Sequence, residues 1–243
     1  MHRVLISPAT IHDDMITIQD PKTLHHLVHV LRIAVGDRLE CVDGSGQLHT
    51  GTVTSRSRLA VAVTVEERRH PTSWPLQITL AQAIIRPERF EWALQKATEL
   101  GVSRIIPILT QRTNVRFRAE QATRRLERWQ RIIQSATEQC GRATIPTIED
   151  VVHFRPLIRQ LKGQALLPTL AQHGRTIAEC VNSTSKVTGV TVLIGPEGDF
   201  TDEEVELALN CGIQPVRLGP FTLRAETAAV VALTLIQHAV GVL

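Results

Sequence analysis

Two oppositely charged side chains near the end of the sequence are well placed to do chemistry. Arg224 and Glu226 lie between a glycine-containing turn at Gly219 and an almost wholly apolar run that begins at Ala228. Unpaired charge is costly in such a setting, so charges kept there usually have a function. A guanidinium can stabilise a developing anion, and a carboxylate can accept a proton. A structural salt bridge between the two side chains is the alternative interpretation.

The charged pair belongs to the second of two similar strand–turn–helix units. In the first unit, residues 190–194 predict a strand of a parallel sheet, and the Gly-Pro-Glu-Gly turn at 195–198 ends it. Thr201 and Glu204 have the spacing of a capping box, which predicts a helix that ends near Gly212. Open α/β sheets bind ligands at turns of this kind. Two such turns side by side would make a small-molecule site.

The second unit repeats the arrangement. Residues 213–218 predict a strand, Gly219-Pro220 a turn, and residues 223–240 a helix. Because this helix is apolar almost all round, we expect it to be buried on more than one side and to form a subunit interface. It is too short, and too interrupted by polar residues, to span a bilayer.

Further strand and helix patterns precede these units and predict an α/β domain over residues 73–243. Strands are expected at 76–85, 105–109 and 164–167, and helices at 87–100, 124–140 and 176–181. Pro107 implies an edge or irregular position for its strand. Successive strand–helix units specify a mostly parallel sheet with helices on both faces.

Residues 1–72 read as a separate, small β-rich domain. Strands at 39–42 and 48–54 flank the turn-forming Asp43-Gly44-Ser45-Gly46, and residues 59–65 give a further strand. The helical exception is 21–32, where Leu24 and Leu27 share one face with Val28 and Leu31.

Composition places this chain of 243 residues among ordinary soluble globular proteins, with 43% hydrophobic residues and a formal charge of +3. Four scattered cysteines indicate free thiols of a reducing compartment, and no secretion signal or metal-ligand spacing is visible. Nearly all of the 27 basic residues are arginine, which a GC-rich genome also favours. Their clustering is more informative and predicts an RNA-backbone footprint. The cluster consists of Arg112, Arg116, Arg118, Arg124, Arg125, Arg128 and Arg131.

Several of these motifs together resemble the signature of the RsmE family, the bacterial 16S rRNA (uracil-N3) methyltransferases of the SPOUT superfamily. The motifs are His25-His26-Leu27 with Val30-Leu31-Arg32, Gly36-Asp37, Gln95-Lys96-Ala97-Thr98-Glu99-Leu100-Gly101, Glu138-Gln139-Cys140-Gly141-Arg142, Ile194-Gly195-Pro196-Glu197-Gly198, Leu218-Gly219 and Leu223-Arg224-Ala225-Glu226-Thr227-Ala228. They span nearly the whole chain in the right order. Two positions depart from the family pattern. Asp199 stands where a second glycine is common, and Phe221-Thr222 stands where Arg-Ile is common. The first adds a charge near the ligand loop, and the second puts in doubt any role of that arginine.

The resemblance implies more than the spacing does. It implies a C-terminal SPOUT-type, trefoil-knotted α/β domain, a small N-terminal PUA-like β-barrel that grips RNA, and a homodimer. A knot would not be proposed from the pattern alone, because knots are rare. The RNA-binding residues we expect are His25, Arg32, Arg112, Arg124, Arg128, Gln139 and Arg142. For the histidines, an ordinary position on the outer face of a short helix is an equal alternative.

The cofactor that the resemblance implies is S-adenosylmethionine. The sequence has neither a G-x-G-x-x-G after the first strand of the α/β domain nor a P-loop, so a phosphate cradle is not supported. A pocket lined by backbone suits an adenine edge and a sulfonium. We expect it to be lined by Leu167, Leu193, Ile194, Gly195, Glu197, Gly198, Leu218, Gly219 and Leu223.

The predicted reaction is methylation of uridine N3, whose weakly acidic imide must lose its proton. Arg224 would orient the base and its charge, and Glu226 would accept the proton or position Arg224. Thr227, Arg142 and Gln139 would make contacts to the base or across the dimer. The uridine would leave its stack. Two alternatives stay open: a ribose 2′-O-methyltransferase of the same superfamily, and a non-catalytic RNA-binding or assembly protein. The expected partner is 16S rRNA or the 30S subunit, in the cytoplasm, with no membrane and no metal.

Overall fold

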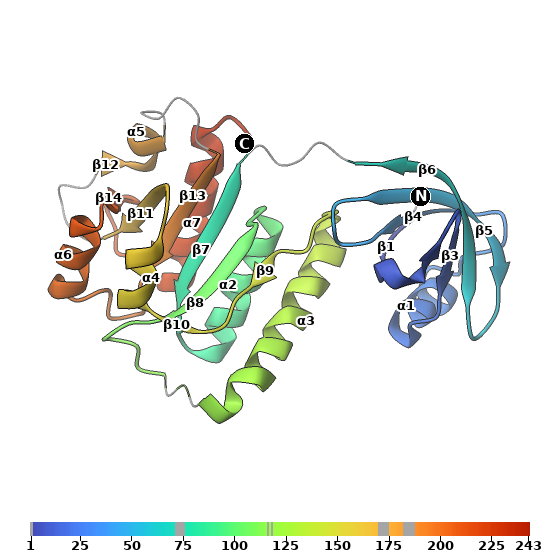
Figure 1. Cartoon of the computed structure of the whole chain (residues 1–243), viewed down its shortest axis with the longest axis horizontal. Coiled ribbons are helices and arrows are strands. Elements are labelled where there is room, and N and C mark those ends of the chain that lie inside the picture. Colours follow the sequence, from blue (N-terminus) through green and yellow to red (C-terminus); the bar gives the residue numbers. More distant parts are fainter. Residues whose placement is uncertain (1, 71–75, 116, 118, 170–174, 182–187) are drawn as a thin grey trace. The chain divides into compact units, whose positions relative to one another are not determined.

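The computed structural model describes residues 2–70, 76–115, 117, 119–169, 175–181 and 188–243. The chain divides into two compact units (Figure 1). The first comprises Met1–Ser73 together with Thr137–Ile145, and the second comprises Trp74–Ala136 together with Pro146–Leu243. Among the described residues, no helix combines the length and the apolar character that crossing a bilayer requires.

The first unit contains a six-stranded sheet in the order β1-β4-β5-β6-β3-β2. The strands are β1 (His2–Leu5), β2 (Ile11–His12), β3 (Met15–Ile18), β4 (Arg38–Val42), β5 (Leu48–Arg56) and β6 (Val61–Arg69). The pairing of β1 with β4 is parallel and the other pairings are antiparallel. Strands β4, β5 and β6 were predicted. Strands β1, β2 and β3 were missed because none exceeds four residues, too few for an alternation to be read.

The helical segment of this unit is less regular than its sequence pattern predicts. A single α-helical turn, α1 (Pro21–His25), passes directly into a π-helical turn, η2 (His26–Val30). The carboxylate of Asp20 caps α1 by accepting a hydrogen bond from the amide of Thr23, at 2.8 Å. Leu24 and Leu27 are buried in the core of the unit, as their shared face predicts.

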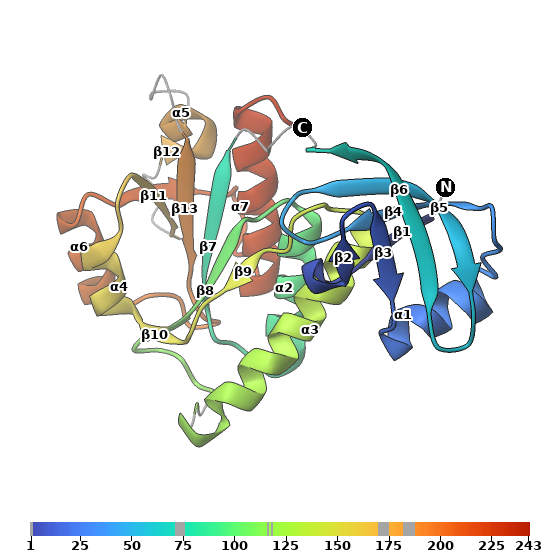
Figure 2. The same ribbon diagram turned by 45° about the vertical axis from the view of Figure 1, so that its right-hand side comes forward.

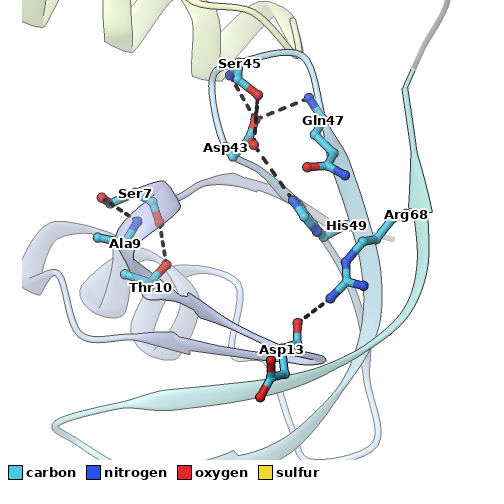
Figure 3. A network of polar contacts seen from close by, with 9 residues as sticks. All are labelled: Ser7, Ala9, Thr10, Asp13, Asp43, Ser45, Gln47, His49 and Arg68. Atoms are coloured by element: carbon cyan, nitrogen blue, oxygen red, sulfur yellow. Dashed lines mark hydrogen bonds and ion pairs between the residues drawn. The ribbon is translucent and has the colours of Figure 1, made fainter.

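The Asp43 turn between β4 and β5 is fixed by hydrogen bonds to one carboxylate (Figure 3). Oδ1 of Asp43 accepts from the amides of Ser45 and Gln47, at 2.8 and 3.2 Å. Gly44 has a φ of +78°, and a Cβ there would lie 2.8 Å from Cδ1 of Ile145. The backbone angle therefore favours glycine at position 44, and a side chain there would also displace the terminal methyl group of Ile145.

The second unit is built on a parallel sheet in the order β10-β8-β7-β13-β11-β14-β12, with β9 also pairing with β8. The strands are β7 (Gln77–Ala83), β8 (Arg104–Leu109), β9 (Thr147–Ile148), β10 (Val152–His153), β11 (Gln164–Pro168), β12 (Arg175–Thr176), β13 (Gly189–Ile194) and β14 (Gln214–Arg217). All pairings among them are parallel, as the alternation of strands and helices predicts.

Helices cover both faces of this sheet (Figures 1 and 2). One face is covered by α2 (Pro87–Glu99), α3 (Ala122–Cys140), α5 (Ile177–Val181) and α7 (Ala225–Ala239), and the other by α4 (Phe154–Gln160) and α6 (Asp202–Asn210). Side chains of β13 alternate between the two cores: Val192 and Ile194 join one, and Leu193 joins the other. Both faces are therefore buried, which accounts for the unbroken apolar run of β13.

Pro107 interrupts the pairing on one side of β8. The strand is not at the edge of the sheet, because β7 pairs along one side of it and the short strands β9 and β10 pair along the other. On the other side, β9 pairs as far as Ile105 and β10 resumes at Ile108. Pro107 falls in the gap between these two short strands, where its missing N–H costs no ladder bond. Of the two predicted positions, the irregular one is confirmed.

Most other boundaries follow the sequence signals. Thr201 and Glu204 form the predicted capping box of α6, and Gly212 has a φ of +81° after its end. Helix α4 was not predicted, because its seven residues include Pro156 in the first turn and are too few to show a period. The trefoil knot that the resemblance implies stays a prediction.

Candidate active site

A cavity of about 610 Å³ lies where three neighbouring strands of the second unit end. Strands β13, β11 and β14 are adjacent and parallel, so the turns that follow them meet at one edge of the sheet. The lining residues are Arg89, Pro168, Thr169, Ile194, Gly195, Pro196, Glu197, Asp199, Arg217, Leu218, Gly219, Pro220, Phe221, Thr222, Leu223, Arg224, Ala225 and Ala228. The two glycine turns therefore share one cavity, as their sequence pattern predicts.

The first turn is a tight loop closed by its own backbone. The amide of Asp199 donates to the carbonyl of Pro196 at 3.0 Å. Asp199 has a φ of +60°, a conformation that aspartate tolerates better than most residues, and its Oδ1 accepts from the amide of Phe200 at 2.8 Å. A Cβ at Gly195 would lie 3.1 Å from that same Oδ1 and 3.2 Å from the ring of Phe200. A side chain at position 195 would therefore press against Asp199 and Phe200, and these neighbours would have to shift to admit it.

The second turn leaves its backbone open to the cavity. Gly219 has a φ of +146°, and apart from its two chain neighbours no described residue has an atom within 4 Å of a Cβ built on it. Because Gly219 lines the cavity, that empty space is available to a ligand. Helix α7 begins immediately afterwards, with Arg224 at its N-cap position.

A segment that follows β8 supports the first turn from outside the cavity. The guanidinium of Arg112 donates to the carbonyls of Gly198 and Phe200, at 2.9 and 3.1 Å. Nearby, Oε1 of Glu204 accepts from the amide of Gln111 at 2.9 Å, and Glu204 is buried. These contacts fasten the turn and the start of α6 to the end of β8.

Arg89 of α2 connects the first glycine turn electrostatically to the start of α7. Its Nε lies 3.7 Å from Oε1 of Glu226, and its Nη1 lies 3.9 Å from Oε1 of Glu197. Glu226 is 9% exposed, and its Oε2 is buried with no hydrogen-bond partner among the described residues. The alternative of a salt bridge between Arg224 and Glu226 is wrong for this structure, since Arg89 is the partner of Glu226. Arg224 is exposed and makes no ion pair within the described part of the chain.

Most of the predicted cofactor-binding residues line the cavity. Those that do are Ile194, Gly195, Glu197, Leu218, Gly219 and Leu223. Leu167 and Leu193 instead lie in the core beneath the sheet edge, and Gly198 packs against Arg112. Of the predicted catalytic residues, Arg224 lines the cavity, and Glu226 and Thr227 lie behind it in the first turn of α7.

The predicted RNA-binding arginines of the second unit differ in whether their side chains already bind other groups of the protein. Arg112 is held by the first turn, and Arg128 pairs with Glu91, with Nε to Oε1 at 2.6 Å. Arg124 is exposed and has no ion pair in the described chain. The side chain of Arg125 lies over the ring of Phe117, and that of Arg131 bonds to its own helix. Arg116 and Arg118 lie outside the described residues.

The remaining predicted RNA-binding residues belong to the first unit. His25 lies beside His29, with ring centroids 5.0 Å apart, and Arg32 is exposed with a φ of +52°. Gln139 is exposed. Arg142 donates to Oγ1 of Thr144 at 3.3 Å, and partial burial lowers the pKa of its guanidinium. Across the described residues, no group of His, Cys, Asp and Glu side chains is arranged to hold a metal ion.

Sequence reasoning missed Arg89, Arg217 and the Pro168–Thr169 segment of the cavity. Strand topology is the signal that could have found them. Because β7 lies beside β13, the chain that follows β7 reaches the same edge of the sheet and brings Arg89 with it. No local sequence motif determines the order of the strands in the sheet.

Comparisons with known proteins show the family to which the chain belongs. A family model described as an RNA methyltransferase domain matches residues 72–237, and one described as an RNA methyltransferase PUA domain matches residues 18–66. The chain is 32% identical to the ribosomal RNA small subunit methyltransferase E of Synechocystis, over 97% of this chain and 77% of that protein. It is 30% identical to the protein of that name in Bacillus subtilis, over 88% of this chain and 87% of that one.

Two solved structures resemble the whole chain. One is a methyltransferase from Legionella pneumophila in complex with S-adenosylmethionine, with 33% identity, a TM-score of 0.84, and coverage of 98% of this chain and 97% of that one. The other is the ribosomal RNA small subunit methyltransferase E of Neisseria gonorrhoeae bound to S-adenosylmethionine, with 28% identity, a TM-score of 0.83, and the same coverage. Since the family model covers well over half of the chain and the sequence relatives extend across it, this protein belongs to the ribosomal RNA small subunit methyltransferase E family.

Proposed function

We propose that this protein transfers a methyl group from S-adenosylmethionine to N3 of a uridine in the 16S rRNA of the small ribosomal subunit. The observation that carries the proposal is the cavity in which both glycine turns meet beside Arg224. Its position, at the carboxyl ends of adjacent parallel strands, is where α/β sheets bind ligands. The names of the relatives supply the substrate class, which is the RNA of the small ribosomal subunit.

The residues of the cavity fit the cofactor. A volume of about 610 Å³ lies within the range typical of small-molecule sites. The absent Cβ of Gly219 leaves open space against bare backbone, where a flat ring or a thioether chain can approach. The carboxylates of Glu197 and Asp199 complement the positive charges of a sulfonium and an ammonium. When bound, the cofactor would supply an electrophilic methyl group.

Side chains of the protein would then stabilise the negative charge that develops on the uridine and accept its proton. Arg224, exposed at the cavity and without an ion-pair partner in the described chain, would stabilise the anion that develops at O2 or O4 as N3 is deprotonated. Glu226 has a buried oxygen, Oε2, with an unused lone pair that can accept that proton. Arg89 would hold the other oxygen of Glu226 in place. Thr227 would contact the base.

We also infer a homodimer formed through α7. Val230 and Val231 are partly exposed apolar residues on this helix, and neither packs against the core formed by the described residues of the unit. Thr227, in the turn before them, is likewise only half buried, so an interface here would border the catalytic residues. The free state of all four cysteines suits the cytoplasm, where ribosomal subunits are made.

The test is a methyl-transfer assay on 30S subunits from a strain that lacks this modification, with nucleoside mass spectrometry and chromatography as the readout. 3-Methyluridine is the expected product. 2′-O-Methyluridine would indicate the ribose methyltransferase, and RNA binding without any heat of S-adenosylmethionine binding would indicate a non-catalytic protein. Arg224→Ala and Glu226→Gln should each slow a single turnover about a hundredfold or more. The exposed Arg159→Ala and Glu206→Gln serve as matched controls.

A further inference from the structure

A second cavity, of about 320 Å³, lies entirely within the first unit. It is lined by Gln19, Pro21, Leu24, His25, Val28, His29, Arg58 and Leu59. None of these residues is acidic, whereas the active-site cavity carries Glu197 and Asp199. The ionisable side chains that line this cavity, those of His25, His29 and Arg58, can only be neutral or positive, so the lining favours an anion.

One wall of this cavity is the helical segment α1–η2. The π-helical turn is marked by the amide of Leu31 donating to the carbonyl of His26, at 2.9 Å. Single π-helical turns are rare and occur frequently at functional sites. Here the two lining histidines, His25 and His29, stand with ring centroids 5.0 Å apart and ring planes inclined by 35°. Neither ring makes a hydrogen bond within the described chain, and both are exposed.

The other wall is the turn between β5 and β6. Oγ of Ser57 accepts from the amides of Leu59 and Ala60, at 3.1 and 3.0 Å, which fixes the turn. The guanidinium of Arg56 donates to the carbonyl of Val28 at 3.4 Å and ties this turn to the helical wall. The turn presents Arg58, which has no ion pair in the described chain, and Leu59, which is 82% exposed.

We propose that this cavity, which we call the His25–Arg58 pocket, binds one unpaired nucleotide of the RNA substrate. The imidazole rings of His25 and His29 and the side chain of Leu59 would contact the base, and Arg58 would bind its phosphate. The inference rests on the proposed function, because it assumes that the substrate is RNA. Bases of single-stranded RNA stack on aromatic rings and on histidine. The chain has no tyrosine and only 3% aromatic residues, so it has few other rings on which a base could stack. The paired imidazoles of His25 and His29 provide such a surface.

Photo-crosslinking tests the location of the contact in the full-length protein. The probe is a single-stranded oligouridylate that contains 4-thiouridine, and the crosslinked peptides are mapped by mass spectrometry. We expect crosslinks in the peptides that carry His25 and His29 or Arg58 and Leu59. Crosslinks confined to other peptides, with this probe and with thiouridine-substituted 30S subunits, would overturn the proposal.

Binding measurements on variants test the roles of the side chains. Arg58→Ala should weaken binding of the oligouridylate about tenfold. It should also reduce the slope of the logarithm of the binding constant against the logarithm of salt concentration by about the amount expected for one phosphate contact. Leu59→Ser, at a position too exposed to affect folding, should weaken binding without changing that slope. His29→Ala should weaken it about tenfold through lost stacking. Arg38→Ala and His12→Ala change exposed residues of the same unit outside the pocket, and should bind as the wild type does.

Cofactor binding separates this inference from the proposed function. The pocket variants should give the wild-type heat of S-adenosylmethionine binding, because the active-site cavity is in the other unit. If the wild type methylates 30S subunits and all three pocket variants bind RNA as tightly as the wild type, only the pocket proposal is wrong. A wild type that gives no heat with S-adenosylmethionine and no methylated product would instead refute the proposed function.

Discussion

Arg89 lines the active-site cavity, and its Nε lies 3.7 Å from Oε1 of Glu226, a buried residue that is not part of the cavity lining. The same guanidinium lies 3.9 Å from Glu197 in the first glycine turn. One side chain of α2 therefore links the turn after β13 to the helix that carries the proposed proton acceptor. Both distances exceed those of a hydrogen bond, so the contacts have room to shorten when substrate binds.

Replacing Arg89 should damage catalysis through Glu226. Arg89→Ala would leave the buried carboxylate of Glu226 without its cationic partner, and we expect single-turnover methyl transfer to fall at least about tenfold. Arg89→Lys, which keeps the charge, should restore part of the rate. Equal rates for Arg89→Ala, wild type and the Arg159→Ala control would show that the ion pair does not position the glutamate.

His49 should make the folded protein less stable as the pH falls below neutrality. The side chain is 2% exposed, neither ring nitrogen has a hydrogen-bond partner among the described residues, and the nearest carboxylate, that of Asp43, is 3.9 Å away (Figure 3). Burial lowers the pKa of His49, with Asp43 opposing and Arg68 reinforcing that shift. Below the unfolded value of about 6.5, the unfolded chain binds a proton that the folded chain resists, so stability is lost with falling pH.

Denaturation in urea at about pH 7.5 and about pH 5.5 measures this effect. Wild type should lose about 1 kcal/mol more of its free energy of unfolding between these values than His49→Gln does, because the glutamine cannot titrate. The control is His12→Gln, an exposed histidine of the same unit, whose loss should match that of wild type. A His49→Gln protein with the full pH dependence of wild type would contradict the prediction.

The sequence predicted those features of the fold that depend on interactions between residues close together in the chain. The capping box at Thr201 and Glu204, the terminating Gly212 and the presence of a helix at α7 all depend on residues within one or two turns of each other. The meeting of the two glycine turns followed from strands and helices alternating in a parallel sheet. Such features can be read from a single sequence because the residues that interact to form them are close together in the chain.

The rest depended on contacts between distant segments. Arg112 belongs to the arginine cluster that predicts RNA contacts. In the structure its guanidinium instead donates to the carbonyl of Gly198, which belongs to another strand–helix unit. Arg89 looks like a residue on the outer face of a helix until β7 is placed beside β13. The π-helical turn after α1 likewise follows no period that the side chains display. Sequence spacing could not resolve these because strand order and helix register are set by the whole core.

The departure at Asp199 should be tolerated at a small cost in stability. Its φ of +60° favours glycine, and aspartate offsets part of the strain through Oδ1, which accepts from the amide of Phe200. Asp199→Ala keeps the strain and loses the acceptor, so it should unfold with about 1 kcal/mol less free energy than Asp199→Gly. Thermal and urea unfolding measure the difference. An alanine variant as stable as the glycine variant would mean that the turn relaxes to another conformation.

Gly219 and Gly163 form a matched pair that separates backbone strain from ligand exclusion. Both have a positive φ, of +146° and +80°, and apart from the chain neighbours no described residue has an atom within 4 Å of a Cβ at either position. Only Gly219 lines the active-site cavity. Gly219→Ala and Gly163→Ala should therefore each cost about 1 kcal/mol in the free energy of unfolding, because alanine is strained at these angles.

Only Gly219→Ala should also affect the cofactor, because its new methyl group would occupy space that the bare backbone leaves open. We expect its affinity for S-adenosylmethionine in calorimetry to fall about tenfold or more, since overlap with a bound ligand costs more than backbone strain alone. Gly163→Ala should bind the cofactor as the wild type does. If both variants lost affinity equally, loosening of the whole unit would be the cause. If neither did, the cofactor would have to lie away from the second turn, and the assignment of this cavity would be wrong.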